Sequence, residues 1–490
     1  ARQAAAERGL DDGYVITLSR SHIVPFLTFS QRRDLREAAW RAWVSRGEHD
    51  GPHDNRPIAR EILTLRQEQA RLHGHACYAD YVLADTMAGT RAAVNDLLQK
   101  VWAPAAERAA EEQRDLAALA ASNGEPAQIE AWDWRYHAEK LRQQRFDVDE
   151  AAVKPYFPLD RITEAAFDCA SRLFGLRFVH RPELVAYHPD VKVYEVHQGP
   201  GDALVGLFLH DNFARPSKRS GAWMSLYRQQ SRAADGSAVL PIVANNNNFA
   251  KGAPGEPTLL SFDDARTLFH EFGHGLHGLL SNVGYERLSG TNVLRDFVEL
   301  PSQLFEHWLG EREVLRRHAR HHATGEPIPE SLIDRITAAN RFNQGYETLR
   351  YLASARVDMA IHSRTEAEAP DVVAFEREVV ERLGLPAAVG MNHRLPHFLH
   401  LFAGAGYAAG YYVYLWAEVL DADGFDAFTE AGDPFDPAVA QRLREHIYSS
   451  GNSREPREAY RAFRGRDPAV EPMLRERGLL EGLLEDVRPA

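Results

Sequence analysis

The stretch SFDDARTLFHEFGHGLHGLL, residues 261–280, decides how the rest of the sequence is interpreted. Ser261 followed three positions later by Asp264 fits the capping box that begins a helix, although Glu is the commoner third member. Apolar residues then recur at helical spacing, which predicts a helix over about 262–283. We expect this helix to end near Gly284, because glycine can adopt the left-handed conformation of a helix cap.

Two histidines and a glutamate inside this helix form the pattern His270-Glu271-Phe272-Gly273-His274. The histidines are four positions apart, so both imidazoles project from one helical face. This spacing allows both rings to bind one tetrahedral Zn²⁺, and Glu271 can reach a metal-bound water. About one chain in twelve of this composition would contain the pattern by chance, so the alternative is a helix with two surface histidines and a solvated glutamate.

A zinc site of this kind needs a third ligand. His277 shares the face of the other two histidines and stays open as a ligand, although the longer metzincin pattern is absent. The better candidate is Glu299, within DFVELPSQLFEHW at 296–308, because a carboxylate among apolar residues is costly to bury unless it is paired or metal-bound. The alternative is an exposed glutamate at a helix start. Gln303 and Glu306 follow at spacings that allow them to orient the ligands.

A second aromatic stretch, HFLHLFAGAGYAAGYYVYLW, occupies residues 397–416. Tyr407, Tyr411 and Tyr414 are spaced i, i+4 and i+7, which predicts that they share one helical face. A phenol beside a zinc site can donate a hydrogen bond to the oxyanion of a tetrahedral intermediate. On the residues alone, packing of these rings in a core is the favoured interpretation.

Most of the remaining sequence has helical periodicity, and one region is β-like. Apolar residues recur at helical spacing in segments rich in Ala, Leu, Glu and Arg, at 31–46, 59–72, 91–121, 162–174 and 330–420. Short apolar runs between turn residues predict strands at 191–197, 203–209 and 239–244, with 14–18 as a further candidate. The asparagine run 245–248 is interpreted as a polar turn. These patterns predict a mainly helical protein with one small sheet near 187–245.

Composition narrows the class of protein. The 490 residues include 57 Lys+Arg and 70 Asp+Glu, and the net charge of −13 argues against nucleic acid as a main partner. A hydrophobic fraction of 44 % is too high for a disordered chain. The two cysteines, Cys77 and Cys169, can form at most one bridge, and no run of 18 apolar residues occurs. We expect a cytoplasmic protein with no membrane partner.

Several long motifs together resemble the thimet oligopeptidase family of zinc peptidases, and within it the bacterial peptidyl-dipeptidase branch. The motifs are HEFGH, SGTNVLRDFVELPSQLFEHW at 289–308, HFLHLFAGAGYAAGYYVYLWAEVLDAD at 397–423, WDWRYHAEKLR at 132–142, KPYFPLDR at 154–161, YHPDVKVYEV at 187–196 and GAWM at 221–224. The likeness spans essentially the whole chain. It is far more specific than the two-histidine pattern by itself.

The resemblance implies a mainly α fold, a two-lobed helical clam around a deep channel, with one small antiparallel sheet beside the zinc-binding helix. It implies one Zn²⁺ per chain. The residues that match the family's metal ligands are His270, His274 and Glu299. The residues that match its catalytic groups are Glu271 as general base, Tyr407 and Tyr414 toward the oxyanion, and His400 toward the substrate.

The same resemblance suggests a division into a helical lobe at 1–150 and a catalytic region at 151–490. Family members begin with a further helical segment, and we expect this chain to start after it, so the first lobe is expected to be partial. His400 and Tyr407 are seven positions apart, about one more than the family pattern. His400 could therefore lie differently from its family counterpart.

The predicted function is that of a monomeric zinc metallopeptidase that hydrolyses short peptides and releases dipeptides from free C-termini. Two alternatives stay open: an endo-acting oligopeptidase of the same family, or a non-catalytic peptide-binding fragment. Comparing cleavage of a peptide with that of its C-terminally amidated form separates the first two, because only the dipeptidase needs the free carboxylate.

Overall fold

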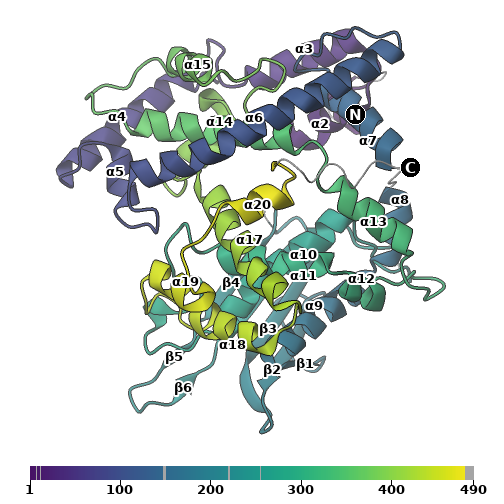
Figure 1. The fold of residues 1–490 in the computed structure, drawn as a ribbon, viewed down its shortest axis with the longest axis vertical. Helices are drawn as coiled ribbons and strands as arrows, with labels where there is room; N and C mark the ends of the chain where they lie inside the picture. Colours follow the sequence, from purple (N-terminus) through teal and green to yellow (C-terminus); the bar gives the residue numbers. More distant parts are fainter. Residues whose placement is uncertain (7, 11–12, 147–149, 219–220, 254, 481–490) are drawn as a thin grey trace. The chain divides into compact units, whose positions relative to one another are not determined.

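The structure is a computed structural model that describes residues 1–480 except 7, 11–12, 147–149, 219–220 and 254. The chain is mainly helical and divides into two compact units (Figure 1). Unit 1 contains residues 1–147, 339–412 and the chain from 477 onward, and unit 2 contains 148–338 and 413–476. Residues 339–412 therefore group with the N-terminal part of the chain, whereas the division proposed from the sequence assigned everything after 150 to one region.

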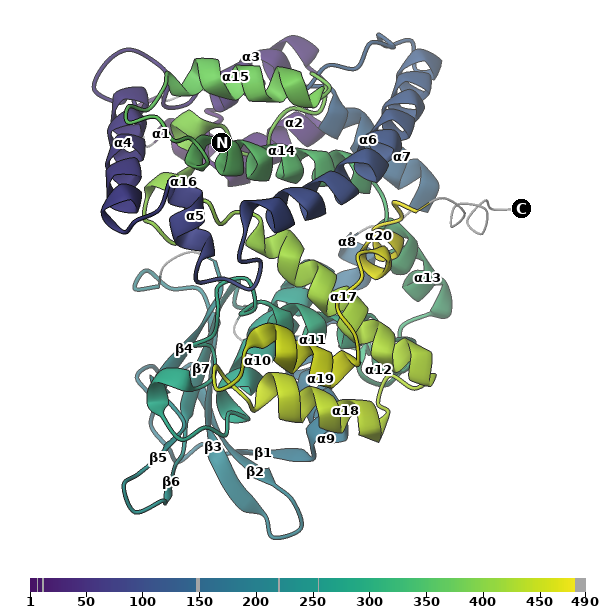
Figure 2. The same cartoon turned by 60° about the vertical axis from the view of Figure 1, so that its left-hand side comes forward.

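The described residues of unit 1 form helices and no strands. The longest helix, α6 (Arg91–Ser122), packs along α14 (Gln344–His362) (Figure 2). Buried Glu112 in α6 accepts hydrogen bonds from the N–H groups of Gly345 and Tyr346 at 3.0 and 2.8 Å, and so binds the first turn of α14. The other helices are α1 (Arg2–Ala6), α2 (Arg20–Phe29), α3 (Arg33–Val44), α4 (Arg56–Leu72), α5 (Tyr78–Leu83), α7 (Trp134–Phe146), α15 (Val372–Leu383) and α16 (Leu399–Phe402).

Unit 2 contains the main sheet, whose strands lie in the order β1-β2-β3-β7-β4. The strands are β1 (Leu176–His180), β2 (Lys192–Gln198), β3 (Ala203–Phe213), β4 (Trp223–Arg228) and β7 (Ile242–Phe249), and a separate pair is formed by β5 (Ser231–Arg232) and β6 (Ala238–Val239). β3 and β7 are parallel, whereas the other neighbours are antiparallel. The expectation of an antiparallel sheet was wrong. The chain that leaves β3 first forms the edge strand β4, and β7 then lies between β3 and β4, parallel to β3 and antiparallel to β4.

Three local predictions about strands need correction. The sheet begins at β1, before the predicted range 187–245. Residues 14–18 form no strand, since the Thr17 hydroxyl contacts Ser19 and His22 at the start of α2. The asparagines 245–248 lie inside β7 instead of a turn. The side chains of Asn246, Asn247 and Asn248 find acceptors on neighbouring segments, as where Asn246 donates to the Trp223 carbonyl at 3.1 Å, so these polar residues are tolerated in the strand.

The helical segments predicted at 31–46, 59–72, 91–121 and 162–174 are confirmed as α3, α4, α6 and α9 (Leu159–Phe174). The predicted segment 330–420 contains several helices separated by loops, and the mainly helical class is confirmed. The helices of unit 2 are α8 (Glu150–Val153), α9 (Leu159–Phe174), α10 (Phe262–Leu279), α11 (Leu300–Gly310), α12 (Arg312–His318), α13 (Glu330–Ala339), α17 (Val413–Ala431), α18 (Pro437–Leu443), α19 (Pro456–Arg464) and α20 (Glu471–Glu476). Among the described helices, none has the length and apolarity that crossing a membrane requires.

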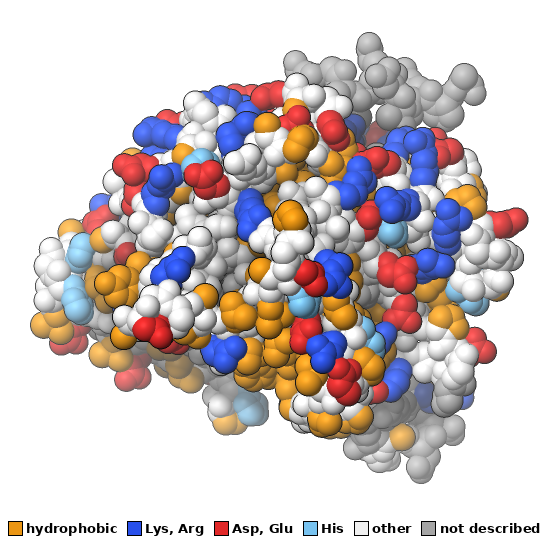
Figure 3. Space-filling model, turned by 90° about the horizontal axis from the view of Figure 1, so that it is seen from below, with side chains coloured by type: hydrophobic (Ala, Val, Ile, Leu, Met, Phe, Trp, Pro, Cys, Tyr) orange, Lys and Arg blue, Asp and Glu red, His pale blue; other side chains and the backbone are white. Residues whose placement is uncertain are grey.

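Charged side chains of both signs are interspersed on the face of the molecule seen in Figure 3. The net charge of −13 is therefore not gathered into a single acidic patch on that face. Net charge alone consequently says little about the local field that a ligand would meet there.

Candidate active site

Helix α10, which carries the two-histidine pattern, starts as predicted and ends earlier than predicted. Ser261 and Asp264 form the full capping box, with Ser261 Oγ accepting from the Asp264 N–H at 3.0 Å. The helix ends at Leu279. The Leu280 N–H still donates to Leu276, but beyond it Asn282 donates to the Ser449 carbonyl at 3.0 Å, and Val283 donates to Gln230 at 2.8 Å. Gly284 is therefore not the helix cap.

Two glycines allow α10 to lie against its neighbours on both sides. A Cβ on Gly273 would lie 2.6 Å from the Pro301 carbonyl oxygen, so the backbones of α10 and α11 approach more closely than any other residue would permit. A Cβ on Gly278 would lie 2.9 Å from the Leu226 side chain of β4 and 3.1 Å from Val243 of β7. Helix α10 is thereby packed between α11 and the β4 edge of the sheet.

The close approach of α11 brings Glu299, the residue that precedes this helix, onto the histidine face of α10. Glu299 Oε2 lies 3.3 Å from His270 Nε2 and 3.1 Å from His274 Nε2. In a tetrahedral zinc site with bonds of about 2.0–2.1 Å, neighbouring ligand atoms are about 3.3 Å apart. These three side chains also form one of the two groups of metal-binding residue types found in the described part of the chain. Their donor types and spacing fit a zinc ion.

Glu306, about two turns after Glu299 along α11, orients the first histidine. Glu306 Oε1 accepts a hydrogen bond from His270 Nδ1 at 2.6 Å, which fixes the ring tautomer and leaves Nε2 as the atom that can bind metal. Ser302 similarly donates to Glu299 Oε2 at 3.0 Å. Gln303, the other orienting group considered from the sequence, has a buried Oε1 with no hydrogen-bond partner in the described structure.

Electrostatics at the site favour an ionised carboxylate and a bound cation. Burial raises the pKa of Glu299, but hydrogen bonds from His270 and His274 outweigh burial and hold that pKa below its ordinary value. Burial lowers the pKa of His270, and the carboxylates of Glu299 and Glu306 outweigh it and hold that pKa well above its ordinary value. A metal ion would replace the protons that the imidazoles share with Glu299, so metal binding is coupled to proton release.

Glu271 occupies a different environment from these ligands. Its side chain is buried, and its Oε2 has no hydrogen-bond partner in the described structure. Burial raises the pKa of this carboxyl above its ordinary value. A buried carboxylate with a free oxygen next to a metal ligand has the properties of a proton acceptor.

His277, which the sequence left open as a third ligand, lies away from this cluster. It is fully buried, its ring meets that of Tyr448 edge-on at 6.3 Å between centroids, and both of its ring nitrogens lack a partner in the described structure. Burial lowers the pKa of His277 to about 3. The histidine is therefore neutral and packed between helices.

This burial predicts acid sensitivity. Because the pKa of His277 falls from 6.5 to about 3 on folding, its neutral form stabilises the fold above pH 6.5, and that contribution is lost as the pH drops. At pH 4 the loss is about 3 kcal/mol. His277→Gln should therefore lose less unfolding free energy than the parent between pH 7 and pH 4, as measured by urea denaturation. His53→Gln, at an exposed histidine, is the control; equal pH slopes for both variants would refute the prediction.

The tyrosines do not share one helical face, contrary to the prediction. Residues 407–412 form turns, Ala409 has a left-handed φ of 53°, and α17 begins only at Val413. Tyr414 lies in the first turn of α17 in unit 2. Tyr407 and His400 lie in unit 1, where their ring centroids are 5.7 Å apart. The structure thus groups Tyr407 with His400, and places Tyr414 in the same unit as the metal-ligand residues.

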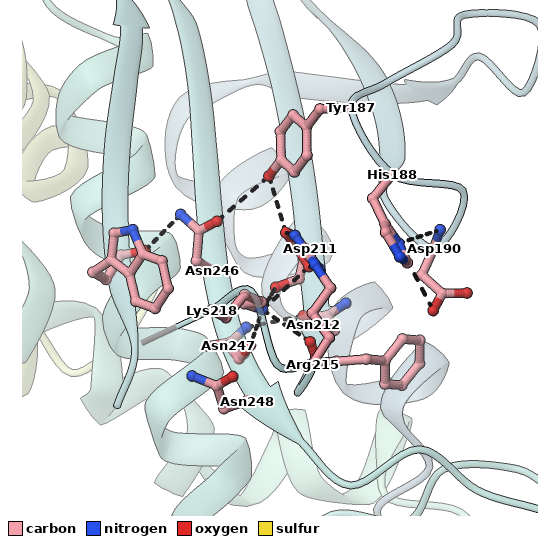
Figure 4. A network of polar contacts seen from close by, with 12 residues as sticks. Tyr187, His188, Asp190, Asp211, Asn212, Arg215, Lys218, Asn246, Asn247 and Asn248 are labelled. Carbon is pink, nitrogen blue, oxygen red and sulfur yellow. Dashed lines mark hydrogen bonds and ion pairs between the residues drawn. The ribbon is translucent and has the colours of Figure 1, made fainter. Parts of the chain in front are cut away.

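A polar network that the sequence analysis did not single out supports the β4 edge of the sheet (Figure 4). Buried Asp211 at the end of β3 accepts hydrogen bonds from Tyr187 at 3.0 Å and from Arg215 at 2.6 and 2.7 Å, and it pairs with Lys218 at 3.2 Å. Lys218 also contacts the Asn247 carbonyl of β7. Because these cations are already paired with Asp211, we assign the network to holding Arg215 and Lys218 against the end of β3 and against β7.

Comparison with known proteins identifies the family. The family model described as peptidase family M3 matches residues 26–479. The chain is 41% identical over 485 residues to dipeptidyl carboxypeptidase of Escherichia coli K12, covering 98% of this chain and 70% of the relative. It is 36% identical over 488 residues to oligopeptidase A of the same organism, covering 98% and 71%.

Among solved structures, the M32 carboxypeptidase of Deinococcus radiodurans R1 is similar in fold. It matches with a TM-score of 0.51 and 16% identity, over 96% of this chain and 81% of that chain. The sequence matches confirm the resemblance that the motifs indicated. The chain belongs to peptidase family M3 and is a metallopeptidase that hydrolyses peptides.

Proposed function

We propose that this metallopeptidase is a peptidyl-dipeptidase that binds one Zn²⁺ through His270, His274 and Glu299. The observation that carries the metal assignment is the convergence of the three donor atoms at spacings of 3.1 and 3.3 Å. The observation that favours dipeptide release is the 41% identity to an enzyme named dipeptidyl carboxypeptidase. The 36% identity to oligopeptidase A supports endo-cleavage as the second candidate.

In this proposal the chain's own residues move the protons. Zinc, when bound, supplies a Lewis acid and lowers the pKa of water. Glu271 accepts the proton of the attacking water and later delivers it to the leaving amine. The hydroxyls of Tyr407 and Tyr414 donate hydrogen bonds to the oxyanion, and His400 contacts the substrate.

The edge strand β4 offers a place for an extended peptide. One side of β4 pairs with β7, and the other side has no strand neighbour among the described residues. Leu226 of β4 packs at Gly278 of α10, so this edge runs beside the metal-ligand helix. Backbone hydrogen bonds to such an edge bind a peptide with little dependence on its side chains.

Cleavage of a peptide and of its C-terminally amidated form tests the proposed activity. A dipeptidase must bind the free carboxylate, so amidation should reduce kcat/KM by about 100-fold or more, since a charged hydrogen-bonded contact is lost. Equal cleavage of both forms would favour the endo-acting oligopeptidase. One metal per chain without hydrolysis of either peptide would leave only a binding role.

Removing the orienting carboxylate should weaken the metal centre. Glu306→Ala is expected to lower metal affinity or activity by about 10- to 100-fold, because His270 loses the acceptor that fixes its ring. Glu306→Gln keeps an acceptor oxygen and should retain most of the affinity. Competition with a chromogenic chelator measures both variants, and parent affinity in the alanine variant would contradict the orienting role.

Tyr414→Phe tests the oxyanion contact. The variant should lower kcat by about 100- to 1000-fold with little change in KM, because a donor that acts mainly in the transition state is lost. Steady-state kinetics on one peptide measures both parameters. Unchanged kcat would remove Tyr414 from the proposed mechanism.

A further inference from the structure

The loop that carries Tyr407 is bound by buried side chains of unit 1. Asp358, in α14, has no exposed surface, and its two carboxylate oxygens accept hydrogen bonds from the N–H groups of Ala409 and Tyr411 at 2.8 and 2.9 Å. Ala409 adopts a left-handed φ of 53°, which costs an alanine about 1–2 kcal/mol. The bonds to Asp358 hold the backbone in this strained turn.

His362 lies next to Asp358, one helical turn further along α14. His362 Nδ1 lies 2.8 Å from Asp358 Oδ1, and His362 Nε2 lies 3.2 Å from an Nη1 of Arg66. A guanidinium group can only donate, so Nε2 must accept and Nδ1 must carry the proton that it donates to Asp358. The hydrogen-bond pattern therefore fixes a neutral histidine between a carboxylate and a guanidinium.

Arg66, in α4, extends the row to the other side of the loop. Its Nη2 donates to the carbonyl of Leu401 and, at 3.0 Å, to that of Gly404. The Arg66 Cζ lies 5.4 Å from the centroid of the Tyr78 ring, and the residue is only 7 % exposed. One continuous buried row, Arg66–His362–Asp358, thus binds the backbone before and after Tyr407.

We propose that Arg66, His362 and Asp358 are positioning residues that fix the place of Tyr407 for catalysis. This proposal rests on the proposed function, in which the Tyr407 hydroxyl donates to the oxyanion. The loop contains three glycines, Gly404, Gly406 and Gly410, and would otherwise have wide backbone freedom. A displacement of about 1 Å in a reacting group can cost about 100-fold in rate. Holding the loop in place before the substrate binds therefore maintains turnover.

Asp358→Asn is the first test, because an amide has one acceptor oxygen where the carboxylate uses two. We expect kcat to fall by about 10- to 100-fold with KM unchanged within about threefold. We also expect backbone amides of residues 399–412 to exchange with deuterium at least about tenfold faster in the substrate-free enzyme. Unchanged exchange in this segment would overturn the proposal.

Glu112→Gln is the matched control. Glu112 is likewise a buried carboxylate of unit 1 that accepts two backbone N–H groups, but they belong to Gly345 and Tyr346. This variant should keep the parent kcat and the parent exchange rates at 399–412. If Glu112→Gln lowered kcat and accelerated exchange as Asp358→Asn is expected to do, the proposal would be overturned. Arg66→Met provides a second variant if Asp358→Asn does not fold, because it removes the donors to the carbonyls of Leu401 and Gly404 and should accelerate exchange in the same segment.

A double-mutant cycle separates positioning from general stability. If Asp358 acts through Tyr407, the double variant Asp358→Asn/Tyr407→Phe should have a kcat within about threefold of Tyr407→Phe alone. If the kcat losses of the two single variants multiply in the double variant, the positioning role is overturned. Parent kcat in Tyr407→Phe alone would instead refute the proposed function of Tyr407, and the exchange measurement would still decide whether the row fixes the loop.

Discussion

Glu271→Gln should lower peptide hydrolysis by at least about 10³-fold while the chain still binds one metal ion. The amide cannot accept a proton from water, yet it has nearly the shape of the carboxylate and is not among the three grouped ligands. Since Glu271 is buried with one unpartnered oxygen, little else in the fold depends on its charge. Steady-state hydrolysis of a short peptide and metal analysis after dialysis measure the two properties separately.

The matched control for this variant is Glu286→Gln, which makes the same chemical change at an exposed position of unit 2. It should keep parent activity and metal content. Hydrolysis by Glu271→Gln at the parent rate would exclude the general-base role. Loss of metal together with activity would indicate instead that Glu271 supports the ligand set.

The second large effect is expected at Glu299. Glu299→Ala should reduce bound metal to less than about a tenth of an ion per chain after dialysis, and hydrolysis should disappear with it. The two remaining histidines supply neutral donors only, so the site loses its one anionic ligand. Thermal unfolding of the metal-free variant should occur below that of metal-free parent protein, because the variant also lacks the contacts of Glu299 with His270, His274 and Ser302.

Comparison of the two variants makes the assignment specific. Both remove a carboxylate beside the same histidines, but Glu271→Gln should lose only hydrolysis, whereas Glu299→Ala should lose metal and hydrolysis together. Parent metal affinity in Glu299→Ala would show that the ligand set is wrong.

The predictions that held depend on short-range geometry. The capping box at Ser261 and the i, i+4 spacing of His270 and His274 follow from helix geometry within about four residues, and the structure forms both. The choice of Glu299 over His277 came from the cost of burying a lone carboxylate. The structure groups Glu299 with the two histidines, whereas His277 is fully buried outside that group.

The predictions that failed depend on contacts between segments distant in sequence. The tyrosine spacing suggested a helix through Tyr407 and Tyr411, but Asp358, about fifty positions earlier, binds the N–H groups that such a helix would use. Asparagines 245–248 resembled a turn, but acceptors on neighbouring segments bind the side chains of Asn246, Asn247 and Asn248 and allow the run to lie within a strand. Neither Asp358 nor the acceptors of the asparagine side chains can be located from local residue preferences.

The sequence by itself determined the helical class, the two-histidine helix and the choice of His270, His274 and Glu299 as candidate ligands, because these follow from periodicity and from the donor chemistry of the side chains. Only the tertiary structure decided that β7 lies parallel to β3, that Glu306 orients His270, and that Arg66, His362 and Asp358 bind the Tyr407 loop. The physical reason is that a buried donor or acceptor must find a partner wherever the folded chain provides one, at any distance in sequence.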